Sequence, residues 1–412
     1  MGAIRPLDVI VAGAGIAGLT AALAFSRRGF KVRVFEQASG FDTVGAGIQL
    51  SPNATRILDR LGVLDLLSPR ATHPAAVLLK DAATLRLLSR IPLGEIAERR
   101  WGAPYVVVHR ADLQAALLAV ATREPSVEIV NGARLTGAQL DGADAVVSVQ
   151  SGEATRHERC DLVIGADGVW SSLRALCGGG SNSRFSGELA WRATIDAASE
   201  AGGALAALTS TDCVTTFLHS GFHLVAYPVG AGAAFNLVAF TQGRSAPRRW
   251  ANKADPSILA DAMRGTEKAL RDLVEKAGPW TLWPVHNVDS HRPWVHSGRL
   301  ALIGDAAHAM TPFAAQGAAM AIEDAETLAY SVSDEQGELA GALSGWEKQR
   351  RRRVLRVARR GALNRLAWHA SGPVALARNT VLKLRGPDKL AADLDWLYGW
   401  KPPEVSVVES HR

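Results

Sequence analysis

The chain has 412 residues, a length that accommodates two or three domains. Its 48% hydrophobic and 21% charged residues are typical of a globular protein with a sizeable core and exclude a disordered or fibrous chain. The three cysteines show no spacing typical of a zinc site or a disulfide framework, so we expect no metal and a reducing, cytoplasmic location. The sequence contains no run of about 20 apolar residues, so we expect no membrane span.

The formal net charge of +6 raises the question of a nucleic-acid partner. Much of the excess lies in one arginine-rich segment with apolar residues at helical spacing: Arg350 to Arg353, Arg356, Arg359 and Arg360. We interpret this segment as the solvated face of a helix, and attraction of an anionic cofactor or substrate is the alternative. Basic and aromatic residues do not interleave as they do in nucleic-acid-binding modules, so we expect no nucleic-acid partner.

The N-terminal residues predict a strand, a tight glycine turn and a helix. An apolar run from Val9 to Val11 is followed by the glycine turn, and a helical pattern resumes from Leu19 to Phe25. The turn is Gly13-Ala14-Gly15-Ile16-Ala17-Gly18. Its glycines permit the turn, the approach of backbone to a pyrophosphate and close packing of helix on strand, while the helix N-terminus favours negative charge. The pattern therefore predicts a dinucleotide site.

A second predicted strand, Lys31 to Phe35, ends at Glu36. A carboxylate at this position accepts hydrogen bonds from the adenosine ribose and repels a 2′-phosphate, which argues against NADP in this site. Glu36 leaves both NAD and FAD as candidates.

Two later segments resemble motifs of the class A FAD-dependent aromatic monooxygenases. Residues 160–168, Cys-Asp-Leu-Val-Ile-Gly-Ala-Asp-Gly, resemble the Asp-Gly motif, which in that family supports FAD and the approach of the nicotinamide cofactor; its second aspartate is Asp167. Residues 299–308 resemble the Gly-Asp motif, in which the resemblance implies that Asp305 holds the ribityl chain. Gln316, Gly317 and Ala318 then lead into a helix whose first amides can stabilise a reduced flavin.

Further segments extend the resemblance over nearly the whole chain, and they are similar to the branch of salicylate hydroxylase, 3-hydroxybenzoate 6-hydroxylase and 6-hydroxynicotinate 3-monooxygenase. Residues 44–54, which include Gly47 and Ile48, resemble the loop and helix beside the flavin. Residues 109–114 resemble the segment whose arginine, here Arg110, contacts FAD, and residues 395–400 resemble the C-terminus of the branch. The resemblance implies bound FAD, with NAD(P)H as a transient co-substrate that has no second fingerprint.

The resemblance also implies an α/β fold, in which a Rossmann-like FAD-binding domain of the para-hydroxybenzoate hydroxylase type carries an inserted antiparallel substrate sheet and C-terminal helices. We expect the FAD-binding domain in three parts, residues 1–72, 101–180 and 286–345. Substrate-domain strands are expected in 73–100, the rest of the substrate domain in 181–285 and a helical region in 346–412. The strand patterns lie at Val77–Lys80, Thr84–Leu88, Glu188–Ile195, Val214–Leu218, Phe222–Tyr227 and Ala234–Phe240.

The strand predicted from Phe222 to Tyr227 places His223, Val225 and Tyr227 on one face. A lone strand histidine is more often a packed or surface residue. However, a His and a Tyr at this spacing are similar to the catalytic segment of 6-hydroxynicotinate 3-monooxygenase, and 3-hydroxybenzoate 6-hydroxylase has a histidine base in the corresponding strand. The resemblance therefore implies that His223 and Tyr227 are catalytic.

A base is useful because the flavin C4a-hydroperoxide of this family is an electrophile that attacks electron-rich rings. Removing the proton of a phenol at neutral pH costs about 4 kcal/mol. A hydrogen-bonded histidine that takes this proton accelerates the attack by roughly a hundred- to ten-thousandfold.

The chain departs from its relatives at two positions. Pro312 stands where 3-hydroxybenzoate 6-hydroxylase has a catalytic glutamine, and Gln49 stands where the 6-hydroxynicotinate enzyme has a histidine. No arginine is marked by pattern as the partner of a substrate carboxylate, and Arg86 and Arg192 are the candidates.

We therefore expect a monomeric or homodimeric monooxygenase that hydroxylates a small phenolic or hydroxypyridine carboxylate with NAD(P)H and O2. A non-catalytic flavin-binding redox sensor, or an epoxidase or oxidase of the same fold, is the alternative. A plain NAD dehydrogenase leaves the two later motifs unexplained, and a flavin halogenase requires a Trp-x-Trp-x-Ile-Pro motif that Trp280-Thr281-Leu282-Trp283-Pro284 does not match.

Overall fold

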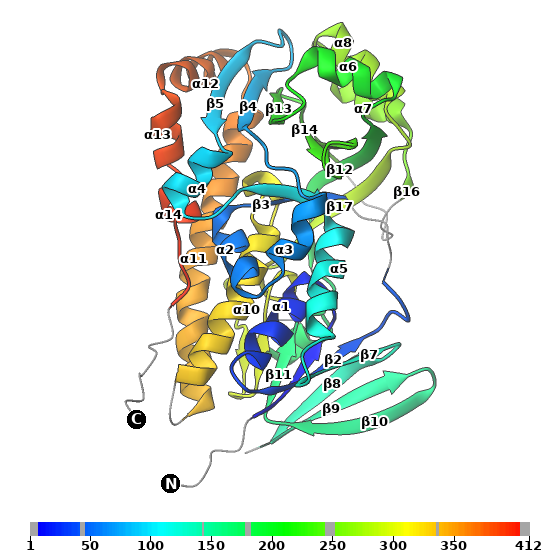
Figure 1. Cartoon of the computed structure of the whole chain (residues 1–412). Coiled ribbons are helices and arrows are strands. Elements are labelled where there is room, and N and C mark those ends of the chain that lie inside the picture. Colours follow the sequence, from blue (N-terminus) through cyan, green and yellow to red (C-terminus); the bar gives the residue numbers. More distant parts are fainter. Residues whose placement is uncertain are drawn as a thin grey trace.

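The computed structural model describes residues 7–41, 46–141, 144–177, 183–243, 252–334 and 338–403. Figure 1 shows two layered parts, one built on each of two large sheets, with the long helix α11 (Leu339–Trp368) running beside both. Within the described ranges, no helix combines the length and the apolar composition that a membrane crossing needs.

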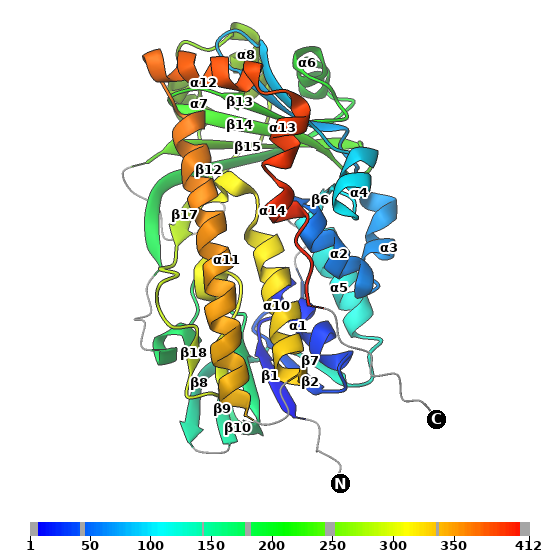
Figure 2. The same ribbon diagram turned by 90° about the vertical axis from the view of Figure 1, so that its left-hand side faces the viewer.

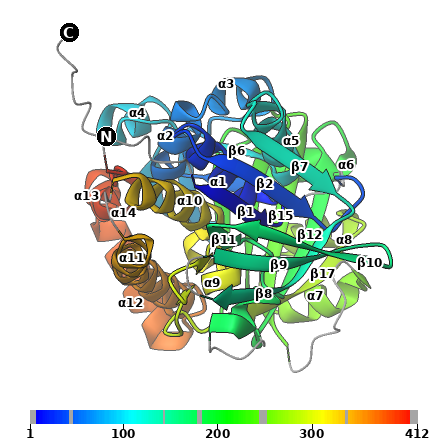
Figure 3. The same cartoon turned by 90° about the horizontal axis from the view of Figure 1, so that it is seen from below.

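The first part is built on a six-stranded sheet in the order β18-β19-β11-β1-β2-β7, in which all pairs are parallel except β18 with β19. Helices cover one face and a three-stranded antiparallel sheet covers the other (Figure 3). The strands are β1 (Asp8–Ala12), β2 (Lys31–Glu36), β7 (Val127–Asn131), β11 (Leu162–Gly165), β18 (Val295–His296) and β19 (Leu300–Leu302). The covering elements are α1 (Ile16–Ser26), α5 (Arg110–Ala121), α10 (Gly317–Asp334), β8 (Arg134–Asp141), β9 (Asp144–Ser151) and β10 (Ala154–Cys160).

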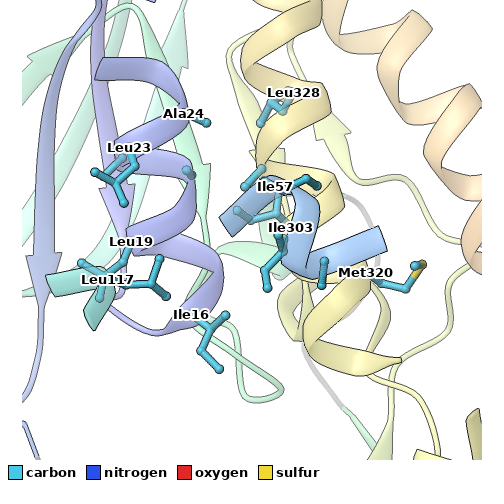
Figure 4. Packing of buried hydrophobic residues seen from close by; sticks show 14 of the residues in the cluster. Ile16, Leu19, Leu23, Ala24, Ile57, Leu117, Ile303, Met320 and Leu328 are labelled. Carbon is cyan, nitrogen blue, oxygen red and sulfur yellow. The ribbon is translucent and has the colours of Figure 1, made fainter. Parts of the chain in front are cut away.

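The core of this part is packed around α1, whose residues are all buried except Ala17. Figure 4 shows Leu19 and Leu23 of α1 beside Leu117 of α5, while Ile57 of α2 (Pro52–Arg60) and Leu328 of α10 pack nearby. The small side chains allow close approach of α1 to α10, and this packing fixes the N-terminus of α1 at the end of β1.

The second part is built on an eight-stranded sheet in the order β16-β17-β12-β15-β14-β13-β4-β5. Its outer face is covered by α6 (Glu200–Leu208), α7 (Pro256–Ala262) and α8 (Lys268–Lys276), which bury a cluster that includes Trp191, Phe217 and Leu273. The strands are β4 (Ala76–Asp81), β5 (Leu87–Pro92), β12 (Arg184–Asp196), β13 (Val214–Leu218), β14 (Phe222–Val229), β15 (Ala234–Gln242), β16 (Asn252–Lys253) and β17 (Thr281–Asn287).

The predicted strands of this sheet are confirmed except at Thr84–Leu88, where the structure has a turn and β5 begins only at Leu87. The Asp81 carboxylate accepts hydrogen bonds from the backbone N–H groups of Ala83 and Thr84, at 3.1 and 3.0 Å, so turn chemistry prevails over the alternating pattern. The sequence predicts an antiparallel sheet. The structure differs at one pair of strands, because β4 pairs in parallel with β13.

Short elements join the two parts (Figure 1). A two-stranded sheet of β3 (Gly47–Leu50) and β6 (Val106–His109) lies between them, and the N–H of Gly47 donates to Asn236 Oδ1 of β15 at 2.9 Å. The remaining helices are α3 (Leu64–Leu67), α4 (Glu95–Trp101), α9 (Asp305–His308), α12 (Gly372–Leu384), α13 (Pro387–Ala392) and α14 (Asp395–Tyr398). Single 3₁₀ turns occupy Ser68–Arg70, Leu173–Cys177 and Pro312–Ala314.

The prediction that the arginine segment is a solvated helix face is wrong at its most important positions. Arg350 is 1% exposed, and its guanidinium bonds Glu323 at 2.7 Å and Asp324 at 2.8 Å, both on α10. Glu323 forms a second ion pair, at 2.6 Å, with Arg353, whose side chain is only 12% exposed. Arg352, Arg356 and Arg359 are exposed, as predicted. The helices α10 and α11, which run side by side in Figure 2, are therefore joined by an internal ion network.

The network continues from α10 into the first part of the fold. Asp324 Oδ2 lies 2.5 Å from His308 Nε2 and accepts the N–H of Gly304 at 3.0 Å, while Glu323 accepts from Asn53 of α2 at 2.7 Å. Burial alone raises the pKa of Asp324, but the charges of His308 and Arg350 outweigh burial and bring this pKa below its ordinary value. A carboxyl group whose pKa is lowered in the folded state stabilises the protein at neutral pH, and it loses this contribution as pH falls through that pKa.

Replacing Arg350 by Met is expected to lower the free energy of unfolding by about 3–5 kcal/mol, because two buried carboxylates lose their common partner. Urea unfolding followed by circular dichroism measures this change. Arg352→Met, at an exposed position of the same helix, serves as the control and should change stability by less than about 0.5 kcal/mol. Equal effects of the two substitutions would mean that the network does not stabilise the fold.

Candidate functional site

A cavity of about 460 Å³ lies between the two parts of the fold. At one end it is bordered by the glycine turn before α1 and by the start of α10, and at the other by β4, β13, β14 and β15. A second cavity, of about 430 Å³, shares Gly15, Arg110 and Arg192 with the first and extends past the end of β2. The two cavities together form an elongated space along the C-terminal edge of the parallel strands, where open α/β sheets bind ligands.

Most of the residues predicted to bind a cofactor border this space. The first cavity is lined by Gly15, Ile16, Ala17, Gly47, Ile48, Arg110, Asp305, Gln316, Gly317 and Ala318, and the second is lined by Glu36. Gly13, Gly18 and Asp167 line neither cavity. Val44 and Gly45, which belong to the loop that resembles the flavin-side segment, lie outside the described residues.

The three glycines of the turn have different environments. A Cβ on Gly13 would lie 2.7 Å from the Ala166 carbonyl oxygen, and one on Gly18 would lie 1.9 Å from the Gly13 oxygen, so packing of the protein itself requires both glycines. A Cβ on Gly15 would meet no protein atom within 4 Å. Gly15 therefore borders open space at a helix N-terminus, and this arrangement fits the close approach of a pyrophosphate.

Glu36 both supports the turn and faces the second cavity. Its two carboxylate oxygens accept backbone N–H groups, from Ala14 at 2.7 Å and from Ala38 at 2.9 Å. Each oxygen retains a lone pair, so the carboxylate can also accept ribose hydroxyl groups.

Asp167 holds a turn instead of facing the cavity. Its Oδ2 accepts the N–H of Ser172 at 2.8 Å, and only its neighbours Ala166 and Gly168 border the first cavity. Asp167 thus shapes the loop beside the cavity, and its role in cofactor binding stays a prediction.

Asp305 and Gln316 are placed by the ion network. Asp305 is the exposed first residue of α9, and β19 ends three residues before it, at Leu302. The Gln316 side chain is buried and donates to Ser51 Oγ at 2.9 Å, so it faces the protein interior. The backbone at the start of α10 is what remains available to a ligand at this end of the cavity.

The other end of the cavity is lined largely by apolar side chains: Val77, Leu79, Ile91, Leu93, Val214, Val225, Val238, Phe240 and Phe313. His223 and Tyr227 border it on the same face of β14 as Val225, in agreement with the predicted alternation. The His223 ring stacks on Phe240 with centroids 4.7 Å apart, and its Nδ1 lies 3.0 Å from Nε2 of His369. These two contacts hold the His223 ring in a defined orientation.

Burial changes the ionisation of both groups. It lowers the pKa of His223 well below its ordinary value, with a smaller contribution from His369, so the ring is neutral at pH 7. Burial likewise raises the pKa of Tyr227, which stays protonated. The site therefore contains one neutral proton acceptor and one hydroxyl donor.

The two candidate arginines differ in position. Arg86 is exposed and borders neither cavity, whereas Arg192 borders both and lies over the Trp283 ring at 5.1 Å. Within the part of the chain that the structure describes, the Arg192 side chain has no hydrogen bond or ion pair, and its Nε is buried without a partner. Burial, and secondarily the nearby Arg110, lower the pKa of Arg192. An anion bound in the cavity would offset both the burial of the Arg192 charge and its repulsion by Arg110.

Sequence reasoning missed the residues that the C-terminal region contributes. Arg360, Asn364 and Trp368 of α11 border the first cavity, and His369 contacts His223. These residues follow one another at the spacing of any long helix, so the sequence gives no signal that predicts their place in the site. Gln49 and Pro312, the two positions at which the chain departs from its relatives, also line the cavity, and the Tyr105 hydroxyl donates to Gln49 at 2.7 Å.

Comparisons with known proteins agree with this geometry. Residues 6–360 match the family model described as "FAD binding domain". The chain is 34% identical over 395 residues to a 3-hydroxybenzoate 6-hydroxylase of Polaromonas naphthalenivorans, covering 96% of both proteins. It is 34% identical to a 6-hydroxynicotinate 3-monooxygenase of Pseudomonas fluorescens, covering 85% of this chain and 89% of that one. A solved salicylate hydroxylase substrate complex aligns with a TM-score of 0.80 at 25% identity, covering 96% of each chain.

Substituting Gly15 by Ala is expected to weaken binding of added FAD by about tenfold or more, because the methyl group enters the space that a pyrophosphate would occupy. Fluorescence titration of the apoprotein measures the affinity. Gly203→Ala in α6, where an added Cβ also meets open space, should leave it unchanged. The Gly15 backbone is extended and suits alanine, so the melting temperature of the apoprotein should be nearly the same in both variants. Unaltered FAD affinity in Gly15→Ala would place the pyrophosphate elsewhere.

Proposed function

Because the chain belongs to the FAD-binding-domain family and is an FAD-dependent aromatic monooxygenase, we propose that it hydroxylates a phenolic or hydroxypyridine carboxylate held between His223 and Arg192. The observation that carries this proposal is the cavity itself, which has apolar walls and combines a neutral, buried histidine with a half-buried guanidinium that has no ion-pair partner among the described residues. A ring that carries a hydroxyl and a carboxylate satisfies both groups.

The cofactor fits the end of the cavity near the glycine turn. Gly15 and Arg110 would contact the pyrophosphate, Glu36 the adenosine ribose and Asp305 the ribityl chain, while the amides of Gly317 and Ala318 would face the isoalloxazine. When bound, FAD supplies the redox chemistry that activates O2 with electrons from NAD(P)H. The amides at the start of α10 favour negative charge on the ring because they have no partner within the helix.

His223 prepares the substrate by removing the proton of its hydroxyl group. The ring that results is richer in electrons than the phenol, and it is therefore more reactive toward an electrophilic oxygen. A neutral imidazole accepts the proton directly, whereas an imidazolium cannot. Tyr227 remains protonated and can donate a hydrogen bond to the substrate from the same face of β14. The apolar walls exclude water and strengthen these contacts.

Arg192 is proposed to bind the carboxylate. Its guanidinium can form two parallel hydrogen bonds to a carboxylate, and the low dielectric of the cavity strengthens the pair. The names of the relatives, 3-hydroxybenzoate and 6-hydroxynicotinate hydroxylating enzymes, denote substrates that carry both a hydroxyl and a carboxylate on one ring.

The proposal includes the conditions in which the enzyme acts. NAD(P)H binds transiently, O2 is the second co-substrate, the location is the cytoplasm and the protein is a monomer or homodimer. The rates of NADH and NADPH oxidation decide between the two donors, and product identification gives the position of hydroxylation and any loss of carbon dioxide.

A substrate screen tests the proposal. The FAD-loaded protein is mixed with NADH or NADPH and with 3-hydroxybenzoate, salicylate or 6-hydroxynicotinate, and NAD(P)H oxidation, hydroxylated product and hydrogen peroxide are measured together. We expect at least one compound to accelerate oxidation and to yield product in excess of peroxide. Oxidation that no hydroxyaromatic acid accelerates would contradict the proposal and favour a redox sensor.

Substituting His223 by Gln is expected to lower kcat of coupled hydroxylation by roughly a hundred- to ten-thousandfold, because glutamine fills the site but cannot take the proton. Product formation by liquid chromatography measures the effect. The control is His157→Gln on β10, an exposed position that borders neither cavity, and it should retain full activity. Full coupled turnover by His223→Gln would exclude His223 as the base.

The pH profile of kcat/KM provides an independent check. Burial keeps His223 neutral as pH falls from 7 through its ordinary pKa of about 6.5. The rate should therefore stay constant over this interval and decline only at more acidic pH, where the lowered pKa of His223 is reached. A decline centred at or above about pH 6.5 would be inconsistent with a buried, neutral base.

Substituting Arg192 by Met is expected to raise KM for the accepted hydroxyaromatic acid by about 30-fold or more, because a charge-assisted pair worth about 2–3 kcal/mol is lost. The matching amide, which carries no charge, should show a much smaller change. Steady-state kinetics with both compounds measure the difference, and Arg86→Met at the exposed candidate position is the control. The same increase in KM for acid and amide would show that Arg192 supports the cavity without binding the carboxylate.

A further inference from the structure

A second histidine contacts the proposed base. His369 is the residue that immediately follows α11, and its backbone N–H donates to the Arg365 carbonyl at 3.1 Å, which fixes its position at the helix end. Its Nε2 lies 3.0 Å from Nδ1 of His223. Trp368 packs against the His223 ring with centroids 5.0 Å apart. The C-terminal end of α11 therefore covers the His223 ring.

The direction of the hydrogen bond between the two rings determines which nitrogen of His223 can act as a base. A neutral imidazole carries its proton on one nitrogen and a lone pair on the other. When His223 donates from Nδ1 to His369, its Nε2 has the lone pair. Nε2 has no hydrogen bond to any residue of the described ranges, and the ring borders the cavity. In the opposite tautomer Nε2 carries the proton and cannot accept another.

The contact also offers a route for the proton. His223 is 1% exposed, so a proton taken from a substrate cannot pass directly to water. His369 is half-buried, and therefore closer to solvent than His223, and it contacts the His223 ring from the end of α11. A proton that moves from His223 to His369 therefore moves toward the surface.

Charged groups around His369 oppose a lasting positive charge there. Arg365, paired with Glu188 of β12 at 2.6 Å, and His219 of the β13–β14 turn are the cationic or titratable groups nearest to it, and burial together with these groups lowers the pKa of His369 to about 4. Asp81 of β4 acts on His219, and Arg378 of α12 donates to the carbonyl oxygens of Ala367 and Trp368. His369 is thus suited to pass a proton on, and poorly suited to store it.

We propose that His369 is a positioning residue that holds His223 in the Nδ1–H tautomer and passes the substrate proton from the cavity toward solvent. This inference rests on the proposed function, in which His223 is the base. The substrate O–H bond breaks as His223 Nε2–H forms, His223 Nδ1–H breaks as His369 Nε2–H forms, and His369 Nδ1–H releases a proton to water. The net result is a phenolate in the cavity and one proton in solution, with both rings neutral and each in its opposite tautomer. The reverse transfer restores both tautomers: His223 Nε2–H protonates the phenolate oxygen of the product, His369 Nε2–H returns its proton to His223 Nδ1, and His369 Nδ1 takes a proton from water.

Two substitutions separate the two roles. In His369→Gln the amide oxygen can still accept from His223 Nδ1, but the side chain cannot relay a proton. In His369→Leu both functions are lost. His157→Gln on β10 serves as the control, and retained FAD content and melting temperature report on folding.

The first measurement uses no substrate. Proton–nitrogen correlation NMR of the FAD-loaded protein with ¹⁵N-labelled histidine assigns the tautomer of His223. We expect Nδ1–H in the wild type and in His369→Gln, and a mixture or the opposite tautomer in His369→Leu. Nε2–H in the wild type, or an unchanged tautomer in His369→Leu, would overturn the positioning role whether or not the hydroxylase proposal holds.

The second measurement follows proton release. A pH indicator in weak buffer is monitored by stopped flow when 3-hydroxybenzoate, or another acid that the substrate screen identifies, binds to the FAD-loaded enzyme. We expect release to slow by about tenfold or more in both His369 variants, and to be abolished in His223→Gln. Normal release in the His369 variants, with loss in His223→Gln, would overturn the relay and leave the base intact. Normal release in His223→Gln would instead contradict the proposed function.

Discussion

The fold depends on a guanidinium that has been removed from water. Arg350 is buried between two carboxylates of α10, and an unpaired charge at that depth would cost several kcal/mol. Its partners reach further, since Asp324 holds the Gly304 backbone and His308 while Glu323 holds Asn53 of α2. These contacts fix the α9 turn, α2 and the start of α10 relative to one another. Because the α9 turn and the start of α10 border the cavity, the ion network positions the cofactor end of the site without contacting a ligand.

The helix α11 connects this network to the substrate end. Arg350 and Arg353 lie near its middle, while Trp368 and the following His369 lie against His223 of β14 at its end. One rigid element thus positions the flavin-binding edge of the parallel sheet and the proposed base of the second sheet. We therefore propose a functional role for α11, a segment that the sequence identifies mainly as a charged helix.

The sequence predicted features that local rules decide. The glycine turn between β1 and α1 follows from spacing alone, and a period of two placed His223 and Tyr227 on one strand face. Features that depend on distant partners were missed. The carboxylates that bury Arg350 lie 26 and 27 positions earlier in the chain, so a run of arginines indicated solvent. Similarly, His369 contacts the proposed base only because α11 ends beside β14. At Thr84, a hydrogen bond to Asp81 forms a turn where the alternating pattern predicts a strand. The division into domains and the roles of the individual site residues stay predictions.

The central claim is that one cavity holds a hydroxyaromatic carboxylate with its hydroxyl group on His223 and its carboxylate on Arg192. A crystal structure of the FAD-loaded enzyme with a hydroxyaromatic acid that it turns over tests this claim most directly. The account predicts a substrate oxygen about 2.6–3.2 Å from His223 Nε2 and the carboxylate paired with the Arg192 guanidinium. A ligand whose hydroxyl group points away from His223, with its carboxylate bound by other residues, would contradict it.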